Sequence, residues 1–137
     1  MTDTERVEAL VPTMRAILDA GASLVILAHQ DRPKGKRVPE MSQKPIVLLL
    51  ENLRYDAREE SNDPTFAKEL SSLGDLYVND AFTNCHRTHA SMVGLAKLLP
   101  AYMGLQLEKE VTHLTSVVED PRRPLVLIVS GAKMQTK

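Results

Sequence analysis

The sequence has a single cysteine, Cys85, and no tryptophan, and aromatic residues make up only 4% of it. One cysteine excludes an internal disulfide and a cysteine-based zinc cluster, which is typical of a protein from a reducing compartment. Neither charge predominates, because 17 Lys and Arg residues oppose 18 Asp and Glu residues, and this balance argues against binding to nucleic acid or to an anionic membrane surface. No apolar run approaches the roughly 20 residues that cross a bilayer, and the N-terminus lacks the apolar core of a signal peptide. We expect a cytoplasmic protein with no nucleic-acid or membrane partner.

The helices predicted from the sequence are amphipathic and lie within one domain. A chain of 137 residues without a linker, repeat or low-complexity segment is expected to form a single domain over residues 1–137. Apolar residues at helical spacing predict helices over 3–20, 64–73, 91–99 and 105–118. Gly21, Gly74 and Pro100 provide the expected stops.

Short β-rich apolar runs alternate with these helices. They predict strands over 23–28, 46–50, 75–79 and 125–129. Runs that are apolar on both faces favour a parallel sheet covered by helices. The fold class is therefore α/β, a Rossmann-like three-layer arrangement of a parallel sheet flanked by helices. Residues 29–45 have no helical period although they join two of the predicted strands, which suggests that a crossover segment is missing there.

Basic side chains follow all four predicted strands. They are His29, Arg32 and Lys34 after the first strand, Arg54 after the second, His86, Arg87 and His89 after the third, and Lys133 and Lys137 after the fourth. In open α/β sheets ligands bind beyond the carboxyl ends of the strands, and Arg binds carboxylate or phosphate oxygens bidentately. The pattern predicts a site for a small, highly anionic ligand.

Other interpretations of these residues are less specific. A single Arg or Lys after a strand is usually solvated surface. His86 and His89 have the spacing of a metal pair, but neither a carboxylate nor a third histidine completes a ligand set, so we predict no metal site. Cys85 and His86 are adjacent and have no orienting acid, "SGAK" lacks the spacing of a phosphate-binding P-loop, and His113 falls within a helix pattern as a surface or partly packed residue.

Several ordered motifs resemble the phosphoglycerate kinase family. They include "DTERVEALVPTMRAILDAGASLVILAH", the basic loop "RPKGKRVPEMS", "VLLLENLRY", "NDPTFAKELSSLGDLYVNDAF" and "HRTHASMVGLAKLLPAYMGLQLEKE". "RRPLVLIVSGAKMQTK" resembles the start of the family's interdomain region, where the family reads G-G-A-K-V-S-D-K. The resemblance implies the N-terminal domain of that fold, truncated and with an internal deletion, and without the C-terminal nucleotide domain.

The resemblance also implies roles for the basic residues. Arg6 matches the arginine of D-T-R-I and, with Lys133, is expected to act in phosphoryl transfer. The expected contacts of 3-phosphoglycerate or 1,3-bisphosphoglycerate are Arg6, His29, Arg32, Arg54, His86, Arg87 and His89. Lys133 and Lys137 match the two lysines that the family directs at the nucleotide phosphates.

The family transfers a phosphoryl group from 1,3-bisphosphoglycerate to ADP in glycolysis with Mg²⁺ present, so Mg-ATP and Mg-ADP are the implied cofactors.

Relative to the family, this sequence lacks the first strand and a helix–strand segment after "SQKP", and the implied adenine and Mg²⁺ sites do not fall within it. It has Gln30 and Asp31 where the family has L-G, and an aspartate beside an anion site opposes binding. We expect a partial substrate site, no turnover by this chain alone, and self-association through exposed sheet edges. The alternative is a non-catalytic remnant that binds small anions or other proteins.

Overall fold

The computed structural model describes residues 4–29, 32–37, 50–126 and 128, with side chains from residue 7 onward. Four helices and one strand lie where the sequence predicts them. The helices are α1 (Thr4–Asp19), α3 (Pro64–Ser71), α4 (Leu95–Leu98), which directly follows the π-helical turn η4 (Ala90–Gly94), and α5 (Leu105–Glu119); the strand is β1 (Tyr77–Asn79). Shorter elements are the 3₁₀ turns η2 (Leu53–Tyr55) and η3 (Phe82–Asn84), the one-turn helix α2 (Ala57–Glu60) and the strand β2 (Ala101–Met103).

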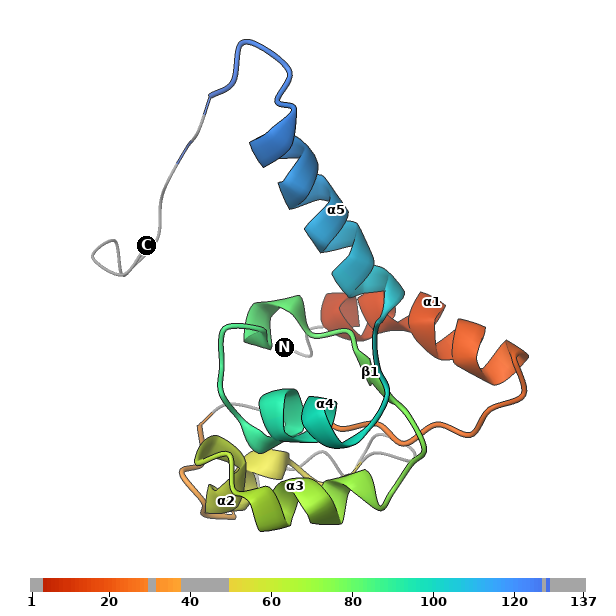
Figure 1. Ribbon diagram of the computed structural model, residues 1–137, viewed down its shortest axis with the longest axis vertical. Helices are drawn as coiled ribbons and strands as arrows, with labels where there is room; N and C mark the ends of the chain where they lie inside the picture. The colour runs from red at the N-terminus through yellow and green to blue at the C-terminus, as the bar shows by residue number, and fades with distance from the viewer. Residues whose placement is uncertain (1–3, 30–31, 38–49, 127, 129–137) are drawn as a thin grey trace.

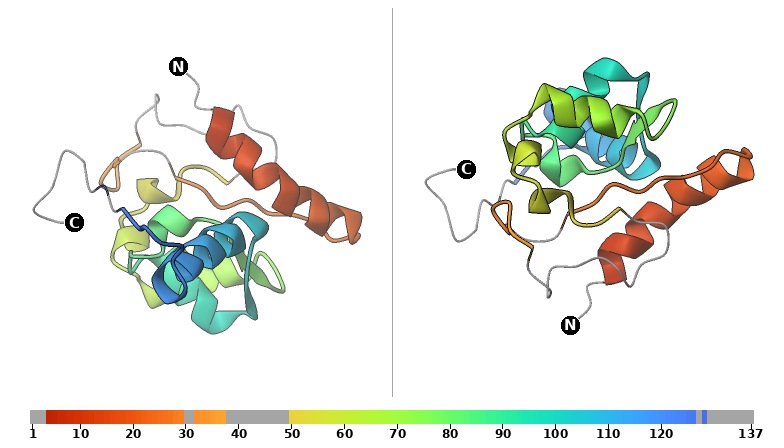
Figure 2. Two further views of the ribbon diagram at one scale, coloured as in Figure 1. Left: turned by 90° about the horizontal axis from the view of Figure 1, so that it is seen from above. Right: turned by 90° about the horizontal axis from the view of Figure 1, so that it is seen from below.

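Local signals explain where two of the predicted helices begin or end. Asp63 accepts hydrogen bonds from the backbone N–H groups of Thr65 and Phe66 at 2.9 and 3.0 Å, so it caps α3, and Pro64 occupies the first turn. At the end of α1, Gly21 has φ +81°, a left-handed conformation that glycine adopts without strain. The chain then turns back along α1 as an extended segment (Figures 1 and 2).

The sheet of the described residues is parallel and has two strands. β1 pairs with β2 so that Val78 lies opposite Tyr102, and η4 and α4 form the crossover between the two strands. The α/β class and the parallel pairing are therefore confirmed. The sequence did not predict β2, because "AYM" is a short segment directly after Pro100. In the structure its three residues are all exposed.

Two of the predicted strands differ from the structure, and a third lies mostly outside it. Over 23–28 a single bridge residue, Ile26, replaces the predicted strand, and this segment is tied to residue 50 by a hydrogen bond from the Leu50 N–H to the Ile26 carbonyl, 3.2 Å. Over 125–129 the described residues form no strand, and Val126 and Ile128 are 76% and 84% exposed. An apolar run becomes a strand only where another strand pairs with it, and none does so there among the described residues. Residues 46–49 of the second predicted strand fall outside the described part.

A small core forms between α3, η4 and α4. Its buried members are Leu53, Phe66, Ala67, Leu70, Ala90 and Leu95. Gly94 makes this close packing possible, because a Cβ at that position would lie 2.7 Å from the Cβ of Ala67. α5 packs against α1 at its beginning and then extends away from the rest of the molecule (Figure 1). No helix in the described ranges is both long enough and apolar enough to span a membrane.

Candidate anion-binding site

Arg54 is the buried centre of the candidate site. It lies in η2, whose first residue is preceded by Asn52, and the Asn52 side chain caps the turn by accepting a hydrogen bond from the Arg54 N–H at 3.2 Å. The Leu53 N–H donates to the Ala28 carbonyl and the Gly35 N–H donates to the Arg54 carbonyl, both at 3.2 Å. These bonds place Arg54 beside the loop that follows residue 28. The Arg54 side chain is only 3% exposed.

Four other predicted ligand residues act electrostatically on this centre or on one another. Burial and, to a smaller extent, the charges of Arg54, Arg87 and His89 together lower the pKa of His29 to about 4. Burial also lowers the pKa of Arg54, with smaller contributions from Arg87 and, last, Arg32. Because these effects require short distances in a poorly solvated region, the residues share one site. We call it the cationic cluster, and its members are His29, Arg32, Arg54, Arg87 and His89.

Two carboxylates that the sequence analysis did not single out lie against the cationic cluster. Glu60 Oε1 is 3.7 Å from Arg54 Nε, and Glu59 Oε1 is 3.7 Å from His89 Nδ1. Glu59 is 2% exposed and accepts hydrogen bonds from both the N–H and the hydroxyl of Ser91. No signal in "REESND" distinguishes this buried carboxylate from a solvated one.

Glu59 partly offsets the lowering of the pKa of His89 by burial and by nearby arginines. Burial lowers the pKa of His89, the charge of Glu59 opposes that effect, and Arg54 and Arg87 lower the pKa again. The two glutamates therefore reduce the mutual repulsion of the cations, and the cluster retains three guanidinium groups against two carboxylates. It is a preformed positive site.

Arg87 has hydrogen-bonding capacity left for a ligand. Its side chain is half-buried, and its Nε has no hydrogen-bond partner within the ranges that the structure describes. A buried guanidinium N–H without a partner is costly, and an anion that accepts from it removes that cost.

The remaining predicted site residues do not join the cluster in the described structure. His86 is exposed and is not among the residues that shift the pKa of His29, Arg54 or His89. Arg6 belongs to α1, but its side chain lies outside the described part, as do Lys133 and Lys137. His113 is exposed on α5, as the sequence analysis expected of a surface residue. Among the described residues, no three His, Cys, Asp or Glu side chains are grouped as a metal site requires.

A parallel β-strand pair with a helical crossover and a cluster of cations around the buried Arg54 define an α/β protein with a cationic site. The family model of phosphoglycerate kinase matches residues 1–47 and 43–137, which together include every residue. The chain therefore belongs to the phosphoglycerate kinase family.

Individual relatives support the same assignment. The chain is 43% identical to the phosphoglycerate kinase of Maricaulis maris and 44% identical to that of Methylorubrum extorquens, in alignments that include all of this chain. It spans 42–43% of the length of these relatives. Each alignment has 171 positions and the chain has 137 residues, so at least 34 positions have no counterpart in this sequence. This difference and the two family matches that meet at 43–47 agree with the predicted internal deletion.

Solved structures resemble the fold over nearly the whole chain. The phosphoglycerate kinase of Coxiella burnetii superimposes with a TM-score of 0.86 and 31% identity, over 99% of this chain and 42% of the other. The phosphoglycerate kinase of Pyrococcus horikoshii superimposes with a TM-score of 0.81 and 29% identity, over 98% and 43%. The described arrangement is thus a partial phosphoglycerate kinase fold.

Proposed function

We propose that the cationic cluster binds 3-phosphoglycerate, and that this chain is the substrate-binding part of a phosphoglycerate kinase. The observation that carries the proposal is the group of cations around the buried Arg54, together with the unpartnered Nε of Arg87 within the described ranges. 3-Phosphoglycerate bears a carboxylate and a phosphate, and guanidinium groups bind both bidentately. Each charged hydrogen bond contributes about 1.5–3 kcal/mol in such a setting.

His29 is suited to a ligand that arrives with negative charge. Its pKa of about 4 leaves the ring neutral at neutral pH. A neutral imidazole presents one donor nitrogen, so it binds an oxygen without adding a further charge to the cluster. The incoming anion neutralises the surrounding cations and raises the pKa of His29.

The phosphoryl transfer itself requires parts beyond the cationic cluster. In the proposed glycolytic reaction, 1,3-bisphosphoglycerate and ADP give 3-phosphoglycerate and ATP. Arg6 and Lys133 are the proposed catalytic residues of this chain. Lys133 and Lys137 are proposed to contact the nucleotide phosphates. His86, which is exposed and outside the cationic cluster, is a further basic residue that we propose for the approach of the substrate. Phosphoryl transfer depends mainly on positioning and on neutralising the charge of the transferred group, which suits these cations. Because the chain spans 42% of a relative, we expect Mg-ATP or Mg-ADP binding and turnover only when the remaining part is supplied.

The test is calorimetric titration of the folded chain with 3-phosphoglycerate. We expect saturable binding with one site per chain, weakened about 10- to 100-fold by Arg87→Ala, since one charged hydrogen-bonding group is lost. Arg15→Ala is the matched control, because Arg15 is exposed on α1 and is not among the residues that shift the pKa of His29, Arg54 or His89. Circular dichroism confirms folding of each variant.

Absence of saturable binding by the folded chain would contradict the proposal and favour the non-catalytic remnant. If binding is observed, the complementary part of the Maricaulis maris enzyme is then added. ATP formation in that mixture, lost in Arg87→Ala and kept in Arg15→Ala, is the result expected of a kinase part.

A further inference from the structure

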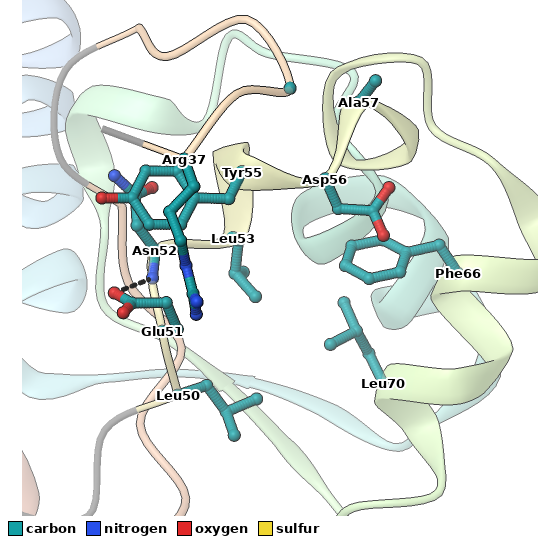
Figure 3. A pocket seen from close by; sticks show the side chains of 11 residues that line it. Arg37, Leu50, Glu51, Asn52, Leu53, Tyr55, Asp56, Ala57, Phe66 and Leu70 are labelled. Carbon is teal, nitrogen blue, oxygen red and sulfur yellow. Dashed lines mark hydrogen bonds between the residues drawn. The ribbon is translucent and has the colours of Figure 1, made fainter. Parts of the chain in front are cut away.

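A cavity of about 550 Å³ opens between the basic loop, the turn η2 and α3 (Figure 3). Its wall includes Arg37, Leu50, Leu53, Tyr55, Phe66 and Leu70. Arg37 and Tyr55 lie on one side of the cavity in Figure 3, whereas Phe66 and Leu70 of α3 lie on the other.

The cavity reaches the hydrophobic core. Leu53, Phe66 and Leu70 are core residues, and Leu50 packs against them. Protein interiors are normally close-packed, and apolar side chains that face an open space lose contacts with neighbouring atoms. Among the described residues, no packing element covers this opening, which leaves room for a further one.

The comparisons indicate which element it is. The two family matches meet at residues 43–47, and at least 34 positions of the relatives have no counterpart in this chain. Arg37 precedes this junction, Leu50 follows it, and both line the cavity. Chain inserted at the junction would leave and re-enter the fold beside this opening.

We propose that the cavity is a docking site for the segment that the relatives carry between the two family matches, which meet at residues 43–47 of this chain. We call these roughly 34 residues the junction segment. The chain binds the junction segment when it is supplied as a separate peptide. The occupant is an extended or helical segment with large aliphatic side chains, because the floor that it meets is formed by Leu50, Leu53, Phe66 and Leu70. The proposal depends on the family membership and not on binding of 3-phosphoglycerate.

The test uses a synthetic peptide with the junction segment of the Maricaulis maris relative. The full 137-residue chain is titrated with it calorimetrically and melted in its presence. We expect saturable binding with one peptide per chain and a Tm that rises with peptide concentration, since a ligand of the folded state alone stabilises it. A scrambled peptide of the same composition is expected neither to bind nor to raise the Tm.

Two variants locate the binding site. Leu50→Glu is expected to weaken peptide binding at least about tenfold, because it places a charge against the apolar floor. Ala57→Glu is the second variant, because Ala57 lines the cavity but is exposed, so folding tolerates the substitution. Leu76→Glu is the matched control, because Leu76 is 54% exposed and does not line the cavity, and it is expected to leave the affinity unchanged.

Three results would overturn this inference: no binding by the folded chain, equal binding of the scrambled peptide, or a dimer of the chain that Leu50→Glu dissociates and the peptide does not. The last result would assign the cavity to a second copy. A parallel titration with 3-phosphoglycerate separates the two proposals. If the chain binds 3-phosphoglycerate but not the peptide, the result contradicts the docking site and not the proposed anion site.

Discussion

His29 is a half-buried ring whose ionisation depends on several cationic neighbours. Burial, the largest influence, and the charges of Arg54, Arg87 and His89 together lower its pKa to about 4, against an opposing effect of Glu60. The sequence placed His29 after a predicted strand, but its burial and its charged neighbours depend on the fold, since Arg54, Arg87 and His89 lie 25 to 60 positions away in the sequence. At the residue scale, the pKa of His29 therefore reports both the burial of the ring and the assembly of the cationic cluster.

We expect Arg87→Met to raise the pKa of His29 from about 4 toward its ordinary value of 6.5, because one of the charges that lowers it is removed. The measurement is a titration of the His29 ring resonances by NMR. Arg15→Met, remote from the cluster, is expected to leave the pKa unchanged. A His29 that titrates near 6.5 in the unmodified chain would contradict the assembly of the cluster.

At the scale of elements, α5 is anchored at its beginning by a carboxylate. Asp80, directly after β1, accepts hydrogen bonds from the Thr13 hydroxyl at 2.6 Å and from the Leu107 N–H at 2.8 Å. The Thr13 hydroxyl oxygen accepts from the Leu105 N–H at 3.0 Å. α1, β1 and α5 thus meet at one carboxylate, which also complements the positive end of the α5 dipole. Gly104 permits this approach, because a Cβ there would lie 2.4 Å from Asp80 Cγ.

We expect Asp80→Ala to lower the free energy of unfolding by about 1–3 kcal/mol, because it leaves the Leu107 N–H and the Thr13 hydroxyl without their acceptor. Urea denaturation measures the loss, and hydrogen exchange is expected to accelerate first in α5. Asp75→Ala is the control, because Asp75 is exposed. Equal stability of the two variants would show that Asp80 does not anchor α5.

On the scale of the whole molecule, the chain has a small core and extensive exposed apolar surface. Six buried apolar side chains form the core cluster of the described residues, whereas α5 alone exposes Val111, Leu114, Val117 and Val118. Small cores give marginal stability, so individual protonation events have measurable effects on folding.

The half-buried His29 and the buried His89 make the stability of the chain depend on pH. The folded-state pKa of His29 lies at about 4 and that of His89 also lies below 6.5, so between these values the unfolded chain binds more protons than the folded chain. The contribution of these two histidines to the free energy of unfolding is therefore fully present above pH 6.5 and is lost as the pH falls toward 4. For the half-buried His29 we expect a loss of about 1–2 kcal/mol after allowance for solvent screening.

Urea denaturation between pH 7.5 and about 4.5 tests this dependence and stays above the range in which Asp56, whose pKa is lowered from 3.8, begins to take up a proton. His29→Gln is expected to flatten the dependence, and His113→Gln, at an exposed position on α5, is expected to preserve it. An unchanged slope in His29→Gln would contradict the sign derived above.

Sequence alone determined the features that depend on near neighbours in the chain. Asp63 and Pro64 set the start of α3, Gly21 follows the end of α1, and apolar spacing located the four longer helical segments, because caps and amphipathic faces arise within a few residues. The basic residues after the strands also identified five members of one cluster, since parallel strands bring their carboxyl ends to a common edge.

Only the tertiary structure decided which groups are buried and which strands pair. The apolar run at 125–129 forms no strand in its described residues, whereas the exposed "AYM" does, because pairing depends on a partner far away in the sequence. Glu59 and Asp80 look like ordinary acidic residues in the sequence, yet one balances the cations and the other anchors α5. A carboxylate acquires such a role from partners that the fold brings to it: Ser91 as a hydrogen-bond donor and His89 as a nearby ring for Glu59, and Thr13 and Leu107 as donors for Asp80.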